Sequence, residues 1–197
     1  MIDHKSPWER FVLFGEQDLN VRKPILDSWT RCREKGLAHD HHRILFSYLE
    51  DQDFTRKKRQ NHLLFQAAIP VLEEMYNQLQ GGGYQLVLAD AEGVLMEVMA
   101  DSKARSASEG LGISSGIKWM EEQIGTTGLS VAIKSRTTPL ATSGLEHYCT
   151  LFRAWDCAAC PIFADGVFYG VFDICRVGVK DNLQELLSMA IAGAKAV

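Results

Sequence analysis

The pattern with the most evident chemistry is Cys157-Ala-Ala-Cys160, whose spacing is typical of redox and zinc sites. Its apolar surroundings predict a β-strand, and on a strand residues three apart point to opposite faces. Two such cysteines can neither share a metal nor close a disulfide without a distorted backbone. We therefore interpret both as small buried residues. Cys149 and Cys175 can still approach one of them.

Other residue types that bind metals are too isolated to form a site. His147 stands as a single histidine, which is more often a structural hydrogen-bonding residue than a metal ligand. The polar run His39-Asp40-His41-His42 lacks the further ligands that zinc requires. We expect no catalytic residue, no metal and no cofactor, with a small organic effector as the bound molecule.

The formal net charge of −4 gives no electrostatic case for binding nucleic acid directly. The basic run Arg56-Lys57-Lys58-Arg59 falls in a predicted helix and is interpreted as a solvated helix face. No apolar run approaches the roughly 18 residues of a membrane-spanning helix. Charges throughout Met1–Phe14 argue against a signal peptide or membrane anchor. The expected location is the cytoplasm, where cysteines stay reduced.

The first part of the chain reads as helices and loops. Apolar spacing predicts a helix within Val21–Lys35 that stops at Gly36. A second helix is predicted within Asp53–Gln80, with a kink or a break at Pro70. Its apolar face comprises Leu64, Ala68, Leu72, Met75 and Leu79.

Strands and turns dominate from Gly81 onward. Two hairpins are predicted, the second closed by the two-residue Asp165-Gly166 loop that strongly favours a tight turn. A closing helix from about Asp181 carries an apolar stripe suited to packing or dimerisation. The other predicted elements are strands at Tyr84–Ala89, Val94–Met99, Pro139–Thr142, Cys157–Ala164 and Val167–Cys175, and a helix near Thr126–Ser135.

Regular pairing from the Asp165-Gly166 loop assigns side chains of the second hairpin to two faces. The face with three phenylalanines is interpreted as core packed against helices. The other face, lined by small residues and one carboxylate, is interpreted as the wall of a ligand cavity. That cavity face would comprise Ala158, Cys160, Ile162, Ala164, Tyr169, Val171 and Asp173.

Several segments, taken in chain order, resemble the N-terminal sensor region of bacterial sigma-54-dependent activators of acetoin and glycerol catabolism. The similarity extends from Val21 to Arg176. The family usually has Asn where Thr127 stands, and Ala where Cys160 stands, so the effector need not be acetoin or glycerol. The segments are SWTRC (Ser28–Cys32), GYQLVLADAEG (Gly83–Gly93), WMEEQIGTTG (Trp119–Gly128), EHY (Glu146–Tyr148), CAACPIF (Cys157–Phe163) and GVFDI (Gly170–Ile174).

The resemblance implies an α/β (α+β) GAF domain with a central antiparallel sheet flanked by helices, preceded by an N-terminal helical segment. The expected organisation is a helical segment at 1–80, a GAF sensor domain at 81–180 and a packing or dimerisation helix at 181–197. Effector binding would control an ATPase and a DNA-binding helix-turn-helix outside this sequence. We expect a sensor fragment of a larger activator that forms a homodimer through its terminal helices.

Candidate ligand-binding residues come from the segments that would surround the cavity. Aromatic side chains there can line an apolar ligand or cage a cation, although such residues are also common in cores. Thr126 and Thr127 either cap a helix or bind an oxygen-bearing ligand. Glu121 and Glu122 are expected to face solvent or a neighbouring chain. The full candidate set is Trp119, Thr126, Thr127, His147, Tyr148, Phe152, Trp155, Cys160, Val171 and Asp173.

Two other functions compete with the sensor. Some GAF domains reduce free methionine sulfoxide or sense redox state with cysteines, which requires an exposed thiol of low pKa and a nearby resolving thiol. The strand geometry argues against the pair Cys157 and Cys160 in that role. The third function is a dimerisation module with a filled core and no ligand.

Overall fold

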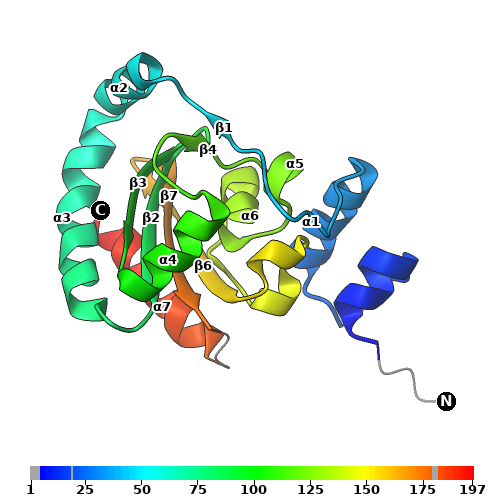
Figure 1. Cartoon of the computed structure of the whole chain (residues 1–197). Helices are drawn as coiled ribbons and strands as arrows, with labels where there is room; N and C mark the ends of the chain where they lie inside the picture. The colour runs from blue at the N-terminus through cyan, green and yellow to red at the C-terminus, as the bar shows by residue number, and fades with distance from the viewer. Residues whose placement is uncertain (1–4, 19, 179–181) are drawn as a thin grey trace.

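The computed structural model describes residues 5–18, 20–178 and 182–197 (Figure 1). Its strands are β1 (Ser47–Tyr48), β2 (Tyr84–Asp90), β3 (Leu95–Ala100), β4 (Ile117–Lys118), β5 (Leu140–Thr142), β6 (Trp155–Ala164) and β7 (Val167–Val177). Its α-helices are α1 (Lys23–Glu34), α2 (Asp51–Gln60), α3 (His62–Leu79), α4 (Ser102–Leu111), α5 (Glu121–Ile124), α6 (Gly128–Ser135) and α7 (Leu183–Ala196). Short turns of π- or 3₁₀-helix lie at Glu9–Phe14, Gly144–Glu146 and Thr150–Phe152.

The main sheet is antiparallel with the strand order β3-β2-β7-β6-β5. Helices lie against both of its faces, as the ribbon shows (Figure 1). β1 and β4 form a separate two-stranded ribbon. The predicted fold, a GAF-like antiparallel sheet flanked by helices, is confirmed.

Both predicted hairpins are present. In the first, the N–H of Gly93 donates to the carbonyl of Asp90 at 3.0 Å, which closes the turn between β2 and β3. In the second, Asp165 and Gly166 have φ angles of 50° and 75°. A two-residue type I′ turn requires positive φ at both central positions, and its twist matches that of the flanking strands.

The pairing of β6 with β7 is interrupted by a β-bulge close to the hairpin turn. Phe163 is opposite Phe168, but the next residue, Ile162, is opposite Gly170, so Tyr169 is an additional residue on β7. Every later pair is therefore shifted by one residue from regular pairing. Glycine is needed at position 170 because a Cβ there would collide with the backbone of β2.

One face of the sheet packs against α3 and α7. The apolar face predicted for α3 is confirmed, since Leu64, Ala68 and Leu72 are buried in this part of the core. α7 lies close to the sheet at Gly193, where a Cβ would be 2.6 Å from the ring of Phe172. The absence of a side chain at this position permits the close approach. Burial of these side chains is the main contribution that fixes both helices to the sheet.

Of the kink or break predicted at Pro70, the break is wrong, because the helical region is interrupted near Asn61 instead. α2 ends and α3 begins around Asn61, while α3 continues through Pro70. Pro70 and Gln66 both lie on the exposed side of α3. Water can therefore bind the Gln66 carbonyl that Pro70 leaves without a helical donor, which lowers the cost of proline inside the helix.

The opposite face of the sheet is covered by α6 and α4; α1 packs on α6, and the N-terminal π-helical turn packs on α1. Arg31 of α1 donates two hydrogen bonds of 2.7 Å to the carboxylate of Glu121, and Ser28 donates a third at 2.5 Å. Glu121 is buried, so the expectation that it faces solvent or another chain is wrong. A single long cation from α1 compensates its charge, and this pair attaches α1 to α5.

α4 lies in a stretch for which the sequence predicted no helix, and Asp101 caps it by accepting from the N–H groups of Lys103 and Ala104. The predicted start of the last helix near Asp181, and the boundary between 180 and 181, lie outside the described residues. Among the described residues, no helix is both long and apolar enough to cross a membrane.

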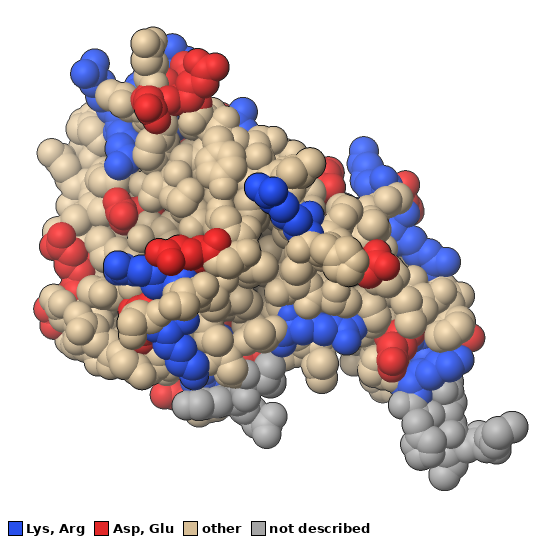
Figure 2. Space-filling model, in the orientation of Figure 1, with Lys and Arg blue, Asp and Glu red and all other residues tan. Residues whose placement is uncertain are grey.

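Acidic and basic side chains are interspersed over the face drawn in Figure 2. The basic run of α2 has partners within the chain: Lys57 pairs with Asp90 and Glu92, and Arg56 pairs with Asp53. α2 has no buried residue. The side chain of Lys57 is only 14% exposed where it pairs with the buried Asp90, so the interpretation as a solvated helix face fits the exposed Arg56 but not Lys57.

Candidate functional site

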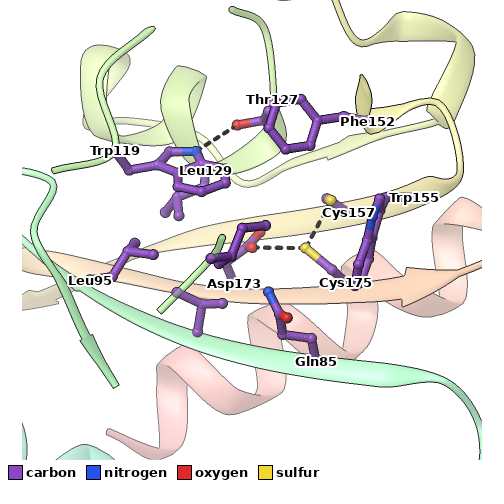
Figure 3. A pocket seen from close by; sticks show the side chains of 12 residues that line it. Gln85, Leu95, Trp119, Thr127, Leu129, Phe152, Trp155, Cys157, Asp173 and Cys175 are labelled. Atoms are coloured by element: carbon purple, nitrogen blue, oxygen red, sulfur yellow. Dashed lines mark hydrogen bonds between the residues drawn. The ribbon is translucent and has the colours of Figure 1, made fainter. Parts of the chain in front are cut away.

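A small cavity lies between the sheet and the segments that cover its second face (Figure 3). Its volume is about 20 Å³, which is room for about one water molecule. Side chains from β2, β3, β6, β7 and α6 and from the connecting loops form its wall. They are Gln85, Val87, Leu95, Ile113, Trp119, Thr127, Leu129, Phe152, Trp155, Cys157, Asp173 and Cys175.

Aromatic and aliphatic side chains make up most of the wall. The indole N–H of Trp119 donates to the hydroxyl of Thr127 at 3.0 Å, which fixes the orientation of that ring. Thr127 also caps α6, because its hydroxyl accepts from the N–H of Ser130 at 3.0 Å. The ring of Phe152 lies 5.8 Å from that of Trp119. The apolar wall is therefore held by a helix cap and by ring packing.

Asp173 is the acidic group of the cavity. It is 2% exposed, and its Oδ2 accepts from the thiol of Cys175 at 3.1 Å. Its Oδ1 is buried and has no hydrogen-bond partner among the described residues. Burial raises the pKa of this carboxyl well above its usual range, the nearby Cys157 sulfur raises it further, and the Cys175 bond opposes both in part.

The cavity also has two sulfur atoms in its wall. Cys157 on β6 lies directly opposite Cys175 on β7, and the thiol of Cys175 approaches the sulfur of Cys157 to 2.8 Å. Because a thiol carries one proton, Cys175 can donate fully to only one of Cys157 and Asp173. Figure 3 shows Cys175 between these two partners.

His147 lies behind Cys157, outside the cavity wall. Its Nδ1 is 3.0 Å from the Thr126 carbonyl and its Nε2 is 3.0 Å from the Trp155 carbonyl. Two carbonyl acceptors favour the doubly protonated ring. Burial opposes that charge, but hydrogen bonding and attraction to Cys157, with the two carbonyls, raise the pKa of His147 above its ordinary value. This agrees with a structural histidine.

The sequence-based candidates divide evenly between wall and surroundings. Trp119, Thr127, Phe152, Trp155 and Asp173 line the cavity. The other five do not: Thr126, His147, Tyr148, Val171 and Cys160 are buried outside the wall. The hydroxyl of Thr126 instead contacts that of Ser28 at 2.7 Å, in the attachment of α1.

The expectation that Cys160 shares a face with Asp173 is wrong. Cys160 belongs to the core formed with α3 and α7, whereas Cys157 takes the position on the cavity face. The bulge at Tyr169 is the physical reason, because it inverts the faces of β6 relative to those of β7. The separation of Cys157 and Cys160 onto opposite faces is confirmed.

Sequence reasoning also missed several wall residues. Gln85, Val87 and Leu95 belong to the first hairpin, whose face pattern was not assigned. Gln85 accepts a hydrogen bond from Ser108 of α4, so the missed helix also helps to position the wall. A polar Gln in an otherwise apolar strand is the sequence signal that could have identified this position. The other missed residues are Ile113, Leu129, Cys157 and Cys175.

The antiparallel sheet flanked by helices is that of a GAF-like fold. A sequence model described as the MimR N-terminal domain matches residues 3–195. The chain therefore belongs to the MimR N-terminal domain family. The predicted resemblance to the N-terminal regions of acetoin-operon activators is confirmed.

Individual relatives are transcriptional activators by name. The chain is 30% identical over 191 residues to the propane 2-monooxygenase operon transcriptional activator MimR of Mycolicibacterium smegmatis, covering 94% of this chain and 31% of that protein. It is 28% identical over 169 residues to the acetoin dehydrogenase operon transcriptional activator AcoR of Bacillus subtilis, covering 85% of this chain and 28% of that protein. The chain thus spans less than a third of the length of these relatives.

A solved structure has a similar fold. It is the Escherichia coli DhaR(N)–DhaL complex, with a TM-score of 0.78 and 19% identity, covering 88% of this chain and 60% of that chain. At this identity the similarity concerns the fold alone.

Proposed function

We propose that this chain is the effector-sensing region of a bacterial transcriptional activator and that it binds a small organic molecule in the cavity that contains Asp173. The family supports a regulatory region, and the cavity supports binding. The observation that carries the proposal is the free Oδ1 of Asp173, a buried oxygen without a partner among the described residues. Such an atom costs stability unless a ligand or water binds it.

The wall suggests the chemistry of the effector. Apolar side chains surround one carboxyl group, so a matching molecule has a short apolar body and one or two oxygen atoms. A protonated Asp173 can donate to a ketone, and either form of it can accept from a hydroxyl. We therefore infer a short-chain ketone, alcohol or diol, a class that includes acetoin, which the names of relatives mention.

Binding requires the wall to move. A cavity of about 20 Å³ has room for about one water molecule, which is less than a molecule with several heavy atoms needs. Rotation of the Trp119 or Phe152 side chain would enlarge it without moving a strand, because neither ring belongs to the sheet; for Trp119 this would break its hydrogen bond to Thr127.

We further propose that binding signals to an ATPase and a DNA-binding domain elsewhere in a longer protein, and that the chain forms a homodimer through α7. The partial coverage of the relatives supports the first proposal. For the second, most of the apolar stripe of α7 packs on the sheet, so a dimer would use its partly exposed residues Leu187 and Ile191.

The decisive experiment is a thermal-shift screen of the chain against short-chain ketones, alcohols, diols and amines. A ligand that binds only the folded state raises stability by about 2.7 kcal/mol at 100 times its dissociation constant. We expect a hit to lose at least about tenfold in affinity in Asp173→Asn, which corresponds to roughly 1.4 kcal/mol. Asp165→Asn is the matched control, because Asp165 is exposed in the hairpin turn.

Other outcomes identify the competing functions. No stabilisation by any compound would favour a dimerisation module with a filled core. Turnover of methionine sulfoxide with a thiol reductant would contradict a purely regulatory role and support a reductase. A hit that binds Asp173→Asn as tightly as the wild type would place the effector elsewhere.

A further inference from the structure

Two cysteines in the cavity wall are arranged for chemistry with each other. Cys157 and Cys175 are directly opposed on the central antiparallel strands β6 and β7, with their sulfur atoms 2.8 Å apart. All five cysteines of the chain are free thiols. The pair is therefore a dithiol within contact distance, and Figure 3 shows both side chains in the wall of the cavity.

The backbone already suits a bond between them. Residues directly opposite in antiparallel strands have Cα atoms about 4.5 or 5.5 Å apart, and disulfides join Cα atoms about 4.4–6.8 Å apart. A disulfide needs the sulfurs to approach to about 2.05 Å, which side-chain rotation alone supplies. The sheet does not have to rearrange.

The surroundings divide the roles of the two sulfurs. The hydrogen bond that Cys175 donates lowers the pKa of the Cys157 thiol in spite of its burial, and His147 lowers it further. Burial raises the pKa of Cys175, and the neighbouring Cys157 and Asp173 raise it too. The pair thus holds its proton on Cys175, which leaves Cys157 as the nucleophilic thiolate.

Access to the pair is narrow. Both residues are buried, each 7% exposed, and both line the cavity of about 20 Å³, so a small oxidant such as hydrogen peroxide would have to reach them through that cavity. The remaining cysteines differ. Burial raises the pKa of Cys32 and of Cys149 to about 12 in each case, and Cys160 lies on the opposite face of the sheet.

We propose that Cys157 and Cys175 form a reversible disulfide in response to peroxide, which adds a redox input to the sensor cavity. The Cys157 thiolate attacks one oxygen of hydrogen peroxide, the O–O bond breaks, and hydroxide leaves and takes up a proton to become water. Cys157 is then a sulfenic acid. Cys175 loses its proton and attacks that sulfur, expelling the hydroxyl group as a second water. In sum, two thiols and one peroxide give one disulfide and two waters.

The disulfide changes the chemistry of the cavity. Oxidation removes the Cys175 S–H, the one donor within reach of Asp173 Oδ2, so Oδ2 joins Oδ1 in having no hydrogen-bond partner among the described residues. The cavity then presents a different hydrogen-bonding pattern to a ligand. The proposal goes beyond effector binding and can be tested with no effector present.

The test uses the 197-residue chain, reduced, treated with hydrogen peroxide at equal concentration, quenched and labelled with N-ethylmaleimide after denaturation. We expect intact-mass spectra to lose two labels, peptide maps to link Cys157 with Cys175, and dithiothreitol to restore both thiols. Cys175→Ser should stop at a sulfenic or sulfinic acid on Cys157. Cys157→Ser should form no bridge and oxidise at least tenfold more slowly.

Cys160→Ser is the matched control, since Cys160 lies on the same strand as Cys157 but on the other face of the sheet. It should form the Cys157–Cys175 bridge at the wild-type rate. Circular dichroism of each variant before oxidation establishes that it is folded. Retention of all labels by the wild type, a bridge between any other pair, or loss of the bridge in Cys160→Ser alone would overturn the proposal. Each of these outcomes is independent of whether an effector is found.

Discussion

Asp173 carries the sharpest conflict between burial and charge in the cavity. A carboxylate with one hydrogen bond and apolar neighbours is poorly solvated, so the protein favours its protonated form. A protonated carboxyl can donate as well as accept, which a ketone or an alcohol can use. The unfavourable position of this residue is therefore consistent with a binding role.

The first prediction concerns the pH dependence of stability. The pKa of Asp173 is raised in the folded chain, so ionisation favours unfolding. Ionisation of Asp173 does not change the free energy of unfolding below the pKa that the carboxyl has in the unfolded chain. As pH rises from there toward the pKa in the folded chain, ionisation lowers the free energy of unfolding progressively. Asp173→Asn should therefore be more stable than wild type at neutral pH, by about 1.4 kcal/mol for each unit of pKa shift.

Urea denaturation at a series of pH values measures this difference. The two chains should become equally stable near about pH 3, where the carboxyl is protonated in both states. Asp165→Asn removes the same charge at an exposed position and should show no such gap. A gap that does not change with pH would contradict the prediction.

A second prediction concerns the hydroxyl of Thr127. It caps α6 and accepts from the indole of Trp119, so one oxygen satisfies two buried donors. Thr127→Val keeps the shape and removes the oxygen. We expect a loss of about 1–2 kcal/mol in the free energy of unfolding, measured with guanidinium chloride. Thr137→Val at an exposed site should cost less than about 0.5 kcal/mol; equal losses would argue against the cap.

At the scale of elements, two helical glycines provide a direct comparison of packing. A Cβ on Gly193 of α7 would meet the ring of Phe172 at 2.6 Å, whereas nothing lies within 4 Å of one on Gly110 of α4. We expect Gly193→Ala to destabilise the chain by roughly 1–3 kcal/mol. Gly110→Ala should stabilise it by about 0.5–1 kcal/mol, since alanine favours a helix. Thermal denaturation checks both, and shifts of the same sign would contradict close packing of α7.

The attachment of α1 to α5 gives a fourth prediction. Arg31→Met leaves the Glu121 carboxylate, whose side chain is 5% exposed, without its cation. A fully buried pair would cost about 3–5 kcal/mol, but the Arg31 side chain is 36% exposed, so we expect roughly 1–2 kcal/mol. Adding Glu121→Gln should recover part of this loss.

Lys23→Met is the control for that pair. Lys23 pairs with Asp27 on the same helix, and both side chains are exposed, so its removal should have almost no effect. Urea denaturation of these three variants and the wild type forms the comparison. If Arg31→Met and Lys23→Met behave alike, the buried pair does not hold α1 in place.

Element types were readable from the sequence, but their register was not. The Asp165-Gly166 loop defined the second hairpin, and apolar spacing defined α1, α3 and α7. Regular pairing then gave the wrong face for β6, because nothing in the sequence marks Tyr169 as a bulge residue. The close approach of the β2 backbone to Gly170, beside the bulge, is a long-range contact that appears only in the folded chain. Asn61 likewise ends a helix through local geometry, whereas Pro70 is the stronger signal in the sequence.

The candidate site depended on that register. Trp119 and Phe152, from the segments that cover the sheet, and Trp155, at the start of β6, were found by their composition and do line the cavity. The wall residue Cys157 on β6 was missed, because regular pairing with β7 assigned it to the other face of the sheet. Long-range contacts, such as that of Cys157 with Cys175, depend on pairing between strands and are invisible to spacing along the chain.

At the scale of the whole molecule, the N-terminal region shares one core with the cavity. Trp8 donates from its indole to the Tyr148 carbonyl at 3.2 Å, and Phe11 packs 5.7 Å from the ring of Trp29. These rings belong to the same apolar cluster as Trp119 and Phe152. We therefore predict that Phe11→Ala costs about 3 kcal/mol or more in the free energy of unfolding.

Unfolding followed with two probes tests the predicted domain boundary at residue 80, which stays a prediction. Tryptophan fluorescence and far-ultraviolet circular dichroism should report one coincident unfolding transition if the core is shared. Two transitions would indicate an independent helical segment. Phe14→Ala, at a side chain that is 53% exposed, is the control and should change stability by less than about 0.5 kcal/mol.

The small volume of the cavity has a kinetic consequence. With room for about one water, a larger molecule enters only after the aromatic wall has opened. When opening is slow, the observed rate of association stops rising at high effector concentration and reports the opening rate itself. A sensor of this kind would respond at a speed set by its own side chains, so two effectors of different affinity would trigger it equally fast and differ in how long the signal lasts.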